Sequence, residues 1–150
     1  MGRGTAPVTV IHHGGCLCGA TRYSVRGAPA IVAHCHCRGC QRGSGAGHST
    51  GAMFPRDRFE ISGAMSTFHL DFENGTRVTR TFCPTCGSGI FGRNDGMAGH
   101  VTTALGTFDD PSAFTPEVVV FARSRPTWDT MNPALPTFDA QPGWKPDGGG

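Results

Sequence analysis

The sequence predicts a mainly β protein, made of short antiparallel strands with little helix. Glycine and proline occur 23 and 11 times among the 150 residues, and both interrupt helices. Short β-branched or aromatic runs alternate with turn-forming residues, as in a chain of strands joined by turns. The length favours one domain. We expect it to comprise residues 12–140, with 1–11 as an N-terminal extension and 141–150 as a flexible tail rich in Pro and Gly.

The individual strands are expected where β-branched and aromatic residues gather between clear breakers. Asn74-Gly75 separates two alternating runs and is typical of a tight hairpin turn. Residues 55–58 and 109–113 are each compatible with a single helical turn. The expected strands are 8–11, 20–25, 30–34, 49–54, 59–62, 66–72, 76–82, 89–91, 100–105 and 118–122.

Segment 36–48 differs from the rest of the chain. It is rich in Gly, Arg, His and Ser and has no hydrophobic periodicity. Such a composition is typical of a functional loop carried by a rigid scaffold. We therefore expect a loop there.

All seven cysteines lie in closely spaced clusters, and this is the main clue to function. An odd count, and the strain of pairing cysteines only one residue apart, argue against a disulfide framework. No secretory signal is recognisable near the start, so a cytoplasmic location and metal binding are favoured. Redox thiols, zinc storage and an iron–sulfur cluster are the alternatives. The clusters are Cys16 with Cys18, Cys35 with Cys37 and Cys40, and Cys83 with Cys86.

Two of the cysteine pairs can close one tetrahedral zinc site. Cys16 and Cys18 face the same side of an extended chain, and Cys83-Pro84-Thr85-Cys86 has the spacing of a zinc knuckle. Four sulfurs complete the coordination of a structural Zn²⁺. This four-cysteine cluster would tie the start of the domain to its second half.

The remaining cysteines, Cys35, Cys37 and Cys40, form a three-cysteine cluster that would leave one coordination position of a second Zn²⁺ open. His36 and His48 are less favoured fourth ligands. Three thiolates make the metal a weak Lewis acid toward water, and a soft site suits a sulfur ligand. The expected chemistry is therefore capture of a thiol and its activation as a nucleophile.

Charge and hydropathy exclude two classes of partner. The formal net charge is +2, with 13 Lys and Arg against 11 Asp and Glu and no long basic run. Binding of two Zn²⁺ by seven thiolates would bring it to about −1. Nucleic acid is therefore not an expected partner. A membrane is not expected either, since no apolar stretch is long enough to cross a bilayer.

These motifs resemble the family of glutathione-dependent formaldehyde-activating enzymes, which also includes centromere protein V. The resemblance covers roughly residues 12–140 and includes all seven cysteines. The segments that carry it are Gly15-Cys16-Leu17-Cys18-Gly19 with Arg22 and Tyr23, His34-Cys35-His36-Cys37-Arg38-Gly39-Cys40-Gln41-Arg42-Gly43-Ser44-Gly45, Phe82-Cys83-Pro84-Thr85-Cys86-Gly87-Ser88, Leu105-Gly106-Thr107-Phe108-Asp109-Asp110-Pro111, Trp128 and Leu135-Pro136.

The resemblance implies folded antiparallel sheets, often called a β-tent. It implies structural zinc at the four-cysteine cluster, and at the three-cysteine cluster a zinc linked to activity and glutathione. It also implies a carbon–sulfur lyase-like enzyme that works in the synthetic direction, joining glutathione and formaldehyde as S-(hydroxymethyl)glutathione. The expected partners are thus a small thiol and an aldehyde.

Candidate residues for this reaction lie beside the cysteines. His34, His36 and His48 could donate a proton to the developing alkoxide, and Arg42 is a further catalytic candidate. Glutathione has two carboxylates that an arginine can bind in a bidentate manner. The candidates for that contact are Arg38, Arg42, Arg22 and Arg93.

A zinc-stabilised β module without catalysis is the main alternative. It would act as a glutathione carrier or as a protein-binding scaffold, for which centromere protein V is the precedent that the resemblance implies. An open zinc position favours the enzyme, because a pure scaffold does not need one.

Overall fold

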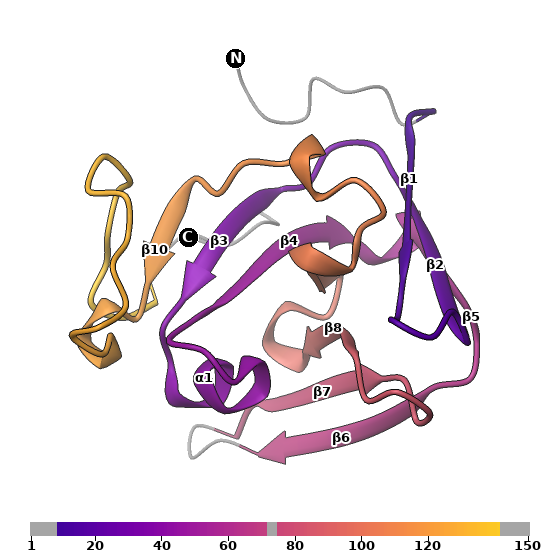
Figure 1. Cartoon of the computed structure of the whole chain (residues 1–150), viewed down its shortest axis with the longest axis horizontal. Helices are drawn as coiled ribbons and strands as arrows, with labels where there is room; N and C mark the ends of the chain where they lie inside the picture. The colour runs from indigo at the N-terminus through magenta and orange to yellow at the C-terminus, as the bar shows by residue number, and fades with distance from the viewer. Residues whose placement is uncertain (1–8, 72–74, 142–150) are drawn as a thin grey trace.

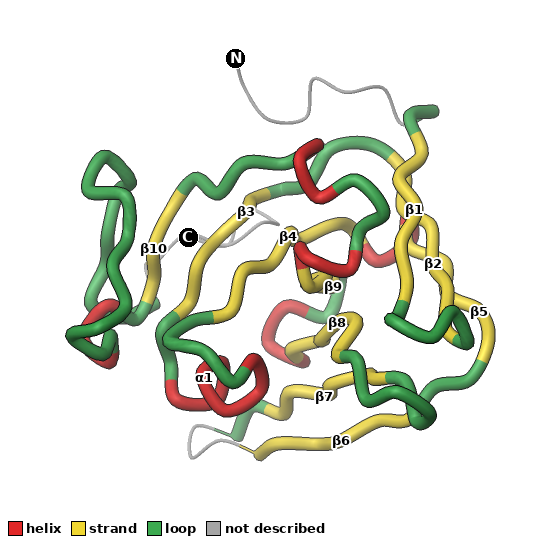
Figure 2. Tube along the Cα trace, in the orientation of Figure 1, coloured by secondary structure: helices red, strands yellow, loops and turns green. Residues whose placement is uncertain are grey.

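The computed structural model describes residues 9–71 and 75–141, and its architecture is mainly β, as predicted (Figures 1 and 2). Two sheets enclose an aromatic core. The expected N-terminal extension and C-terminal tail lie for the most part outside the described residues. None of the helices in the described ranges has the length and apolar character needed to cross a bilayer.

The smaller sheet has three antiparallel strands in the order β1-β2-β5. The larger sheet has seven strands in the order β10-β3-β4-β9-β8-β7-β6, and all its pairs are antiparallel except β10 with β3. The strands are β1 (Ile11–Gly15), β2 (Thr21–Arg26), β3 (Ile31–Cys35), β4 (Ser49–Pro55), β5 (Phe59–Gly63), β6 (Ser66–Asp71), β7 (Arg77–Phe82), β8 (Gly89–Asn94), β9 (His100–Ala104) and β10 (Val118–Val120).

Nearly every predicted strand is present, with ends shifted by a few residues. The first differs most, because β1 begins at Ile11, where the predicted run ends. Its glycines pair with β2, and Gly14 lies where a Cβ would meet the Tyr23 hydroxyl at 2.4 Å. The predicted β6–β7 hairpin is confirmed by the pairing of Asp71 with Arg77, although Asn74 lies outside the described residues.

The short helical turns follow the predictions at two places, within 55–58 and 109–113. The 3-10 turns are η1 (Arg56–Arg58), η2 (Asp95–Met97), η3 (Leu105–Thr107), η4 (Pro111–Ala113) and η5 (Ala122–Ser124).

Segment 36–48 is not wholly a loop, and that prediction was wrong in part: it contains the helix α1 (Arg38–Ser44). Caps define this short helix rather than apolar periodicity. The Cys37 sulfur accepts from the Cys40 N–H at its start, and Gly45, with φ of 75°, ends it. The Gln41 amide then donates to the carbonyls of His36 and Ser124, at 2.8 and 2.9 Å.

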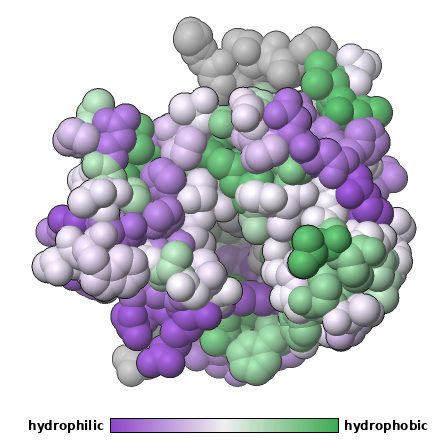
Figure 3. Space-filling model, in the orientation of Figure 1, coloured by the Kyte–Doolittle hydropathy of each residue, from purple (hydrophilic) through white to green (hydrophobic). Residues whose placement is uncertain are grey.

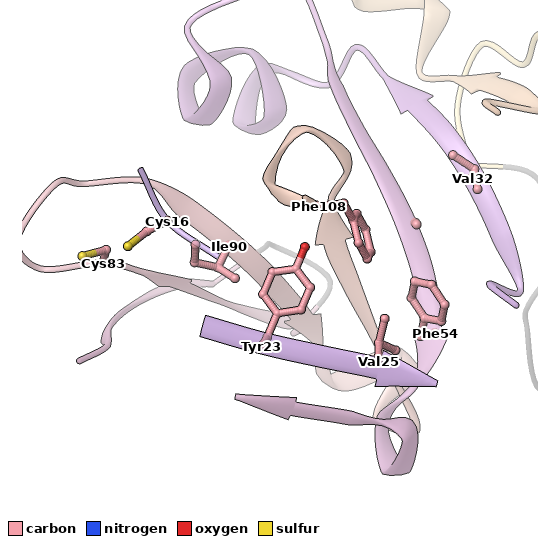
Figure 4. Packing of buried hydrophobic residues seen from close by; sticks show 9 residues of the cluster. Cys16, Tyr23, Val25, Val32, Phe54, Cys83, Ile90 and Phe108 are labelled. Atoms are coloured by element: carbon pink, nitrogen blue, oxygen red, sulfur yellow. The ribbon is translucent and has the colours of Figure 1, made fainter. Parts of the chain in front are cut away.

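The core lies between the two sheets and combines aromatic rings with small aliphatic side chains (Figure 4). Tyr23, Phe54 and Phe108 are buried there, and the Tyr23 hydroxyl is hydrogen-bonded to Thr107 Oγ1 at 2.8 Å. Tyr23 and Phe108 meet edge to face, with ring centroids 5.4 Å apart. This packing fixes the turns that carry Cys16 and Cys83, which lie at one end of the cluster in Figure 4.

Candidate metal centres and their surroundings

The four-cysteine cluster is assembled from the turn after β1 and the turn between β7 and β8. Its four sulfurs lie within 4.8 Å of one another. The Cys16 and Cys18 sulfurs are 3.6 Å apart, and those of Cys18 and Cys83 are 3.7 Å apart. A Zn–S bond of about 2.3 Å in a tetrahedron requires sulfurs about 3.8 Å apart. The spacing therefore fits one closed Zn²⁺ site.

In the turn between β7 and β8, local hydrogen bonds favour the thiolate forms of Cys83 and Cys86. The N–H groups of Thr85 and Cys86 approach the Cys83 sulfur at 3.3 and 3.5 Å. Gly87, with φ of 80°, closes the turn by donating to the Cys83 carbonyl at 2.8 Å. Hydrogen bonds from the Ser88 hydroxyl and backbone lower the pKa of the Cys86 thiol to about 5. Donors directed at sulfur favour the ionised form that a metal requires.

The three-cysteine cluster lies where β3 leads into α1. Cys35 ends β3, Cys37 caps α1, Cys40 lies in its first turn, and all three are half-buried. Their sulfurs lie within 4.8 Å of one another. Among the described residues, no fourth metal-ligating side chain joins this group.

Electrostatics show why a cation suits the three sulfurs. Hydrogen bonds with Cys35 and Cys40 lower the pKa of Cys37, and the bond to Cys37 raises the pKa of Cys35. Three thiolates at this separation repel one another, so without a cation the sulfurs share their negative charge unevenly. A soft divalent ion such as Zn²⁺ would let all three ionise.

The histidines expected beside this cluster form a separate group with Asp129. The His48 Nδ1 and the Asp129 carboxylate are 2.8 Å apart, and His36 Nδ1 lies 3.3 Å from the same oxygen. His36 is fully buried and its Nδ1 donates to the Gly47 carbonyl at 2.7 Å. That nitrogen then has no lone pair for a metal, although the group has the spacing of a metal site. Hydrogen bonding accounts for the Nδ1 atoms of this group, whereas the buried His36 Nε2 has no hydrogen-bond partner among the described residues.

His34 belongs to the same histidine group rather than to the cysteines. Side chains alternate along β3, so His34 and Cys35 lie on opposite faces. The His34 Nδ1 pairs with the Thr50 hydroxyl at 2.7 Å, and its ring meets that of His48 edge to face. Burial, and then the neighbouring His48 and His36, lower the pKa of His34. Sequence reasoning missed Asp129, which joins this group from the distant C-terminal segment. No local pattern in the sequence indicates this contact.

The predicted arginines are scattered over the molecule. Arg22 forms a bidentate ion pair with Asp109 beside the four-cysteine cluster, with Nη1 at 3.0 Å. Arg38 donates to Gln41 within α1, and Arg42 is exposed in the last turn of that helix. Arg93 lines a small pocket of about 100 Å³ together with two other arginines. Hydrophilic side chains gather over α1 in the space-filling view (Figure 3).

Comparison with known proteins supports both the motifs and the fold. A family model described as glutathione-dependent formaldehyde-activating enzyme matches residues 11–124. The crystal structure of a protein from Rhodobacter sphaeroides aligns with a TM-score of 0.54 at 15% identity, covering 84% of this chain and 98% of that chain. No curated protein matches the chain. At this identity, the structural likeness establishes the fold alone.

Proposed function

The chain belongs to the family of glutathione-dependent formaldehyde-activating enzymes, and on this premise we propose that it binds a thiol such as glutathione and condenses it with formaldehyde or a related aldehyde. The two cysteine clusters carry the proposal, because they differ in ligand number. Four sulfurs suit a closed structural Zn²⁺, and three suit a Zn²⁺ that keeps a position for substrate.

The residues of the three-cysteine cluster have a defined part in this proposal. The end of β3 and the capped start of α1 hold the three sulfurs together. Zn²⁺ held there would lower the pKa of an incoming thiol and so supply a nucleophile at neutral pH. Because oxidised cysteines cannot hold Zn²⁺, a reducing compartment such as the cytoplasm belongs to the proposal.

The proposed reaction is an addition to a carbonyl group. The thiolate sulfur attacks the aldehyde carbon and forms a carbon–sulfur bond. The π electrons of the carbonyl move to oxygen, which takes up one proton, and the thiol has lost one proton on ionising. No oxidant or reductant is required, and with glutathione and formaldehyde the product is S-(hydroxymethyl)glutathione. His34, His36 and His48 remain the predicted proton donors, and Arg42 remains the further catalytic candidate.

Carriage of glutathione without catalysis is the second candidate function. The hydrogen bonds of the histidines favour it, since the Nδ1 atoms of His34 and His36 are engaged with Thr50 and Gly47. A protein of this kind would bind the thiol but leave the rate of its reaction with aldehyde unchanged.

The test combines binding with rate. Elemental analysis of the zinc-loaded protein should give two Zn²⁺ per chain, and calorimetry should show saturable glutathione binding. The rate of S-(hydroxymethyl)glutathione formation, followed by NMR, should rise in proportion to protein concentration. Cys37→Ser is the control and should abolish both binding and rate enhancement. Binding without rate enhancement would establish carriage, and no binding to zinc-loaded protein would rule out both functions.

A further inference from the structure

The Arg80 guanidinium on β7 packs against α1, where it occupies the space that a side chain at Gly43 would need. A Cβ built on Gly43 would lie 2.5 Å from Arg80 Nη1 and 3.3 Å from its Cζ. A Cβ on Gly39 would lie 3.4 Å from Nη2. The missing side chain of Gly43 therefore provides space that the guanidinium occupies, whereas a Cβ on Gly39 would be in ordinary van der Waals contact with it. In Figure 1, α1 lies beside β7, in agreement with this contact.

This position brings Arg80 beside the three-cysteine cluster. The Cys37 sulfur lies 3.9 Å from the same Gly39 Cβ position that is 3.4 Å from Arg80 Nη2. A ligand that reaches the three sulfurs would thus also be near a guanidinium.

Several other arginines of the described residues already have partners. Arg22 pairs with Asp109, Arg77 pairs with Asp71, and Arg38 donates to Gln41. Within the described part of the chain, the Arg80 guanidinium has neither a hydrogen bond nor an ion pair. Its donors are thus available to an acceptor from outside the protein.

We propose that Arg80 binds a carboxylate of the thiol substrate and thereby makes the site selective for acidic thiols, an inference that rests on the proposed function. A guanidinium offers two parallel N–H donors to a carboxylate, which sets direction as well as charge. In glutathione, the glycyl carboxylate is the nearer of the two to the sulfur along the covalent chain. This glycyl carboxylate is the group that binds to Arg80 while the glutathione sulfur binds at the three-cysteine cluster.

The test compares glutathione with its glycyl ethyl ester, which keeps the thiol but lacks that charge. Calorimetry on zinc-loaded wild type should show glutathione binding roughly tenfold more tightly than the ester. Arg80→Met should bring the ratio of the two affinities to about one by weakening glutathione binding, while the affinity for the ester stays unchanged. Arg80→Lys should restore part of the ratio, since it keeps the charge without the planar donors. Arg77→Met, on the same strand, is the matched control and should keep the wild-type ratio.

Gly43→Ala provides a second test that does not touch Arg80. Its Cβ would displace the flexible end of the arginine, while alanine favours the helix over glycine. We expect the ratio to fall toward one with thermal stability and zinc content unchanged or higher.

Three results would overturn the inference. The first is that wild type binds glutathione and its ethyl ester with equal affinity. Alternatively, Arg80→Met could weaken both equally, so that Arg80 would only offset the charge of the cluster. If neither thiol binds to zinc-loaded wild type, the proposed function fails and this inference fails with it.

Discussion

Gly47 leaves the space in which Asp129 contacts the histidines. It is buried, and a Cβ built on it would lie 2.3 Å from the Asp129 carboxylate oxygen and 2.6 Å from the Asp129 Cβ. The absence of a side chain lets the C-terminal segment bring Asp129 to His48 and His36. Asp129 also lies beyond residues 11–124, which match the family model, so this contact is outside the part of the chain that the family describes.

Gly47→Ala should therefore disrupt the contact between the C-terminal segment and the histidines. The new methyl group cannot fit without moving Asp129 away, and overpacking of this kind costs about 1–3 kcal/mol. The free energy of unfolding of the zinc-loaded protein, measured in urea, should fall by that amount. Gly99→Ala is the control because no heavy atom lies within 4 Å of its added Cβ. Equal costs for the two variants would contradict this role of Gly47.

At the scale of residues, spacing in the sequence predicts some of the site and misses the rest. The cysteines were assigned to their two clusters because their partners lie a few residues away or in an evident second pair. Asp129 and Arg80 reach the site from distant segments through tertiary contacts. No local pattern in the sequence marks such contacts. Their trace is limited to the glycines at 43 and 47, where an added Cβ would clash with Arg80 and Asp129.

At the scale of elements, α1 shows how a helix can form without a helical pattern. Its two internal glycines lower its intrinsic helix propensity, and among its residues only Gln41 is buried. The Cys37 cap, the Gly45 turn and the hydrogen bonds of Gln41 stabilise it instead. The strands were predictable because alternation along a strand is local, whereas the caps depend on a cysteine that is unusual in that position.

Cys37 has two functions that mutation can separate. Cys37→Ser replaces the thiolate with a hydroxyl, which is among the best acceptors at a helix N-cap. We expect loss of one of two Zn²⁺ per chain with an unchanged far-UV circular dichroism spectrum. Cys37→Ala removes the cap as well and should cost about 1 kcal/mol more in the free energy of unfolding. Retention of both Zn²⁺ in Cys37→Ser would mean that the three-cysteine cluster holds none.

At the scale of the whole molecule, the four-cysteine cluster connects the two sheets. Cys16 and Cys18 follow β1 of the smaller sheet, and Cys83 and Cys86 separate β7 from β8 of the larger one. The strand order was not predictable, because it depends on pairings such as β4 with β9 and β10 with β3 between segments far apart in the chain. The cysteine spacing did predict a link between the two halves, since a shared metal requires four ligands in one place.

Loss of this link should therefore affect the entire fold. Cys86→Ser should give protein that has lost on the order of 5 kcal/mol or more of stability, enough to unfold a typical domain. In a chelator titration of wild type, the three-cysteine cluster should release its Zn²⁺ first, because it has fewer protein ligands, and the fold should persist. Release of the second Zn²⁺ should coincide with loss of the near-UV circular dichroism signal. A soluble, native-like Cys86→Ser protein, or a folded protein after complete zinc removal, would show that the aromatic core alone holds the sheets together.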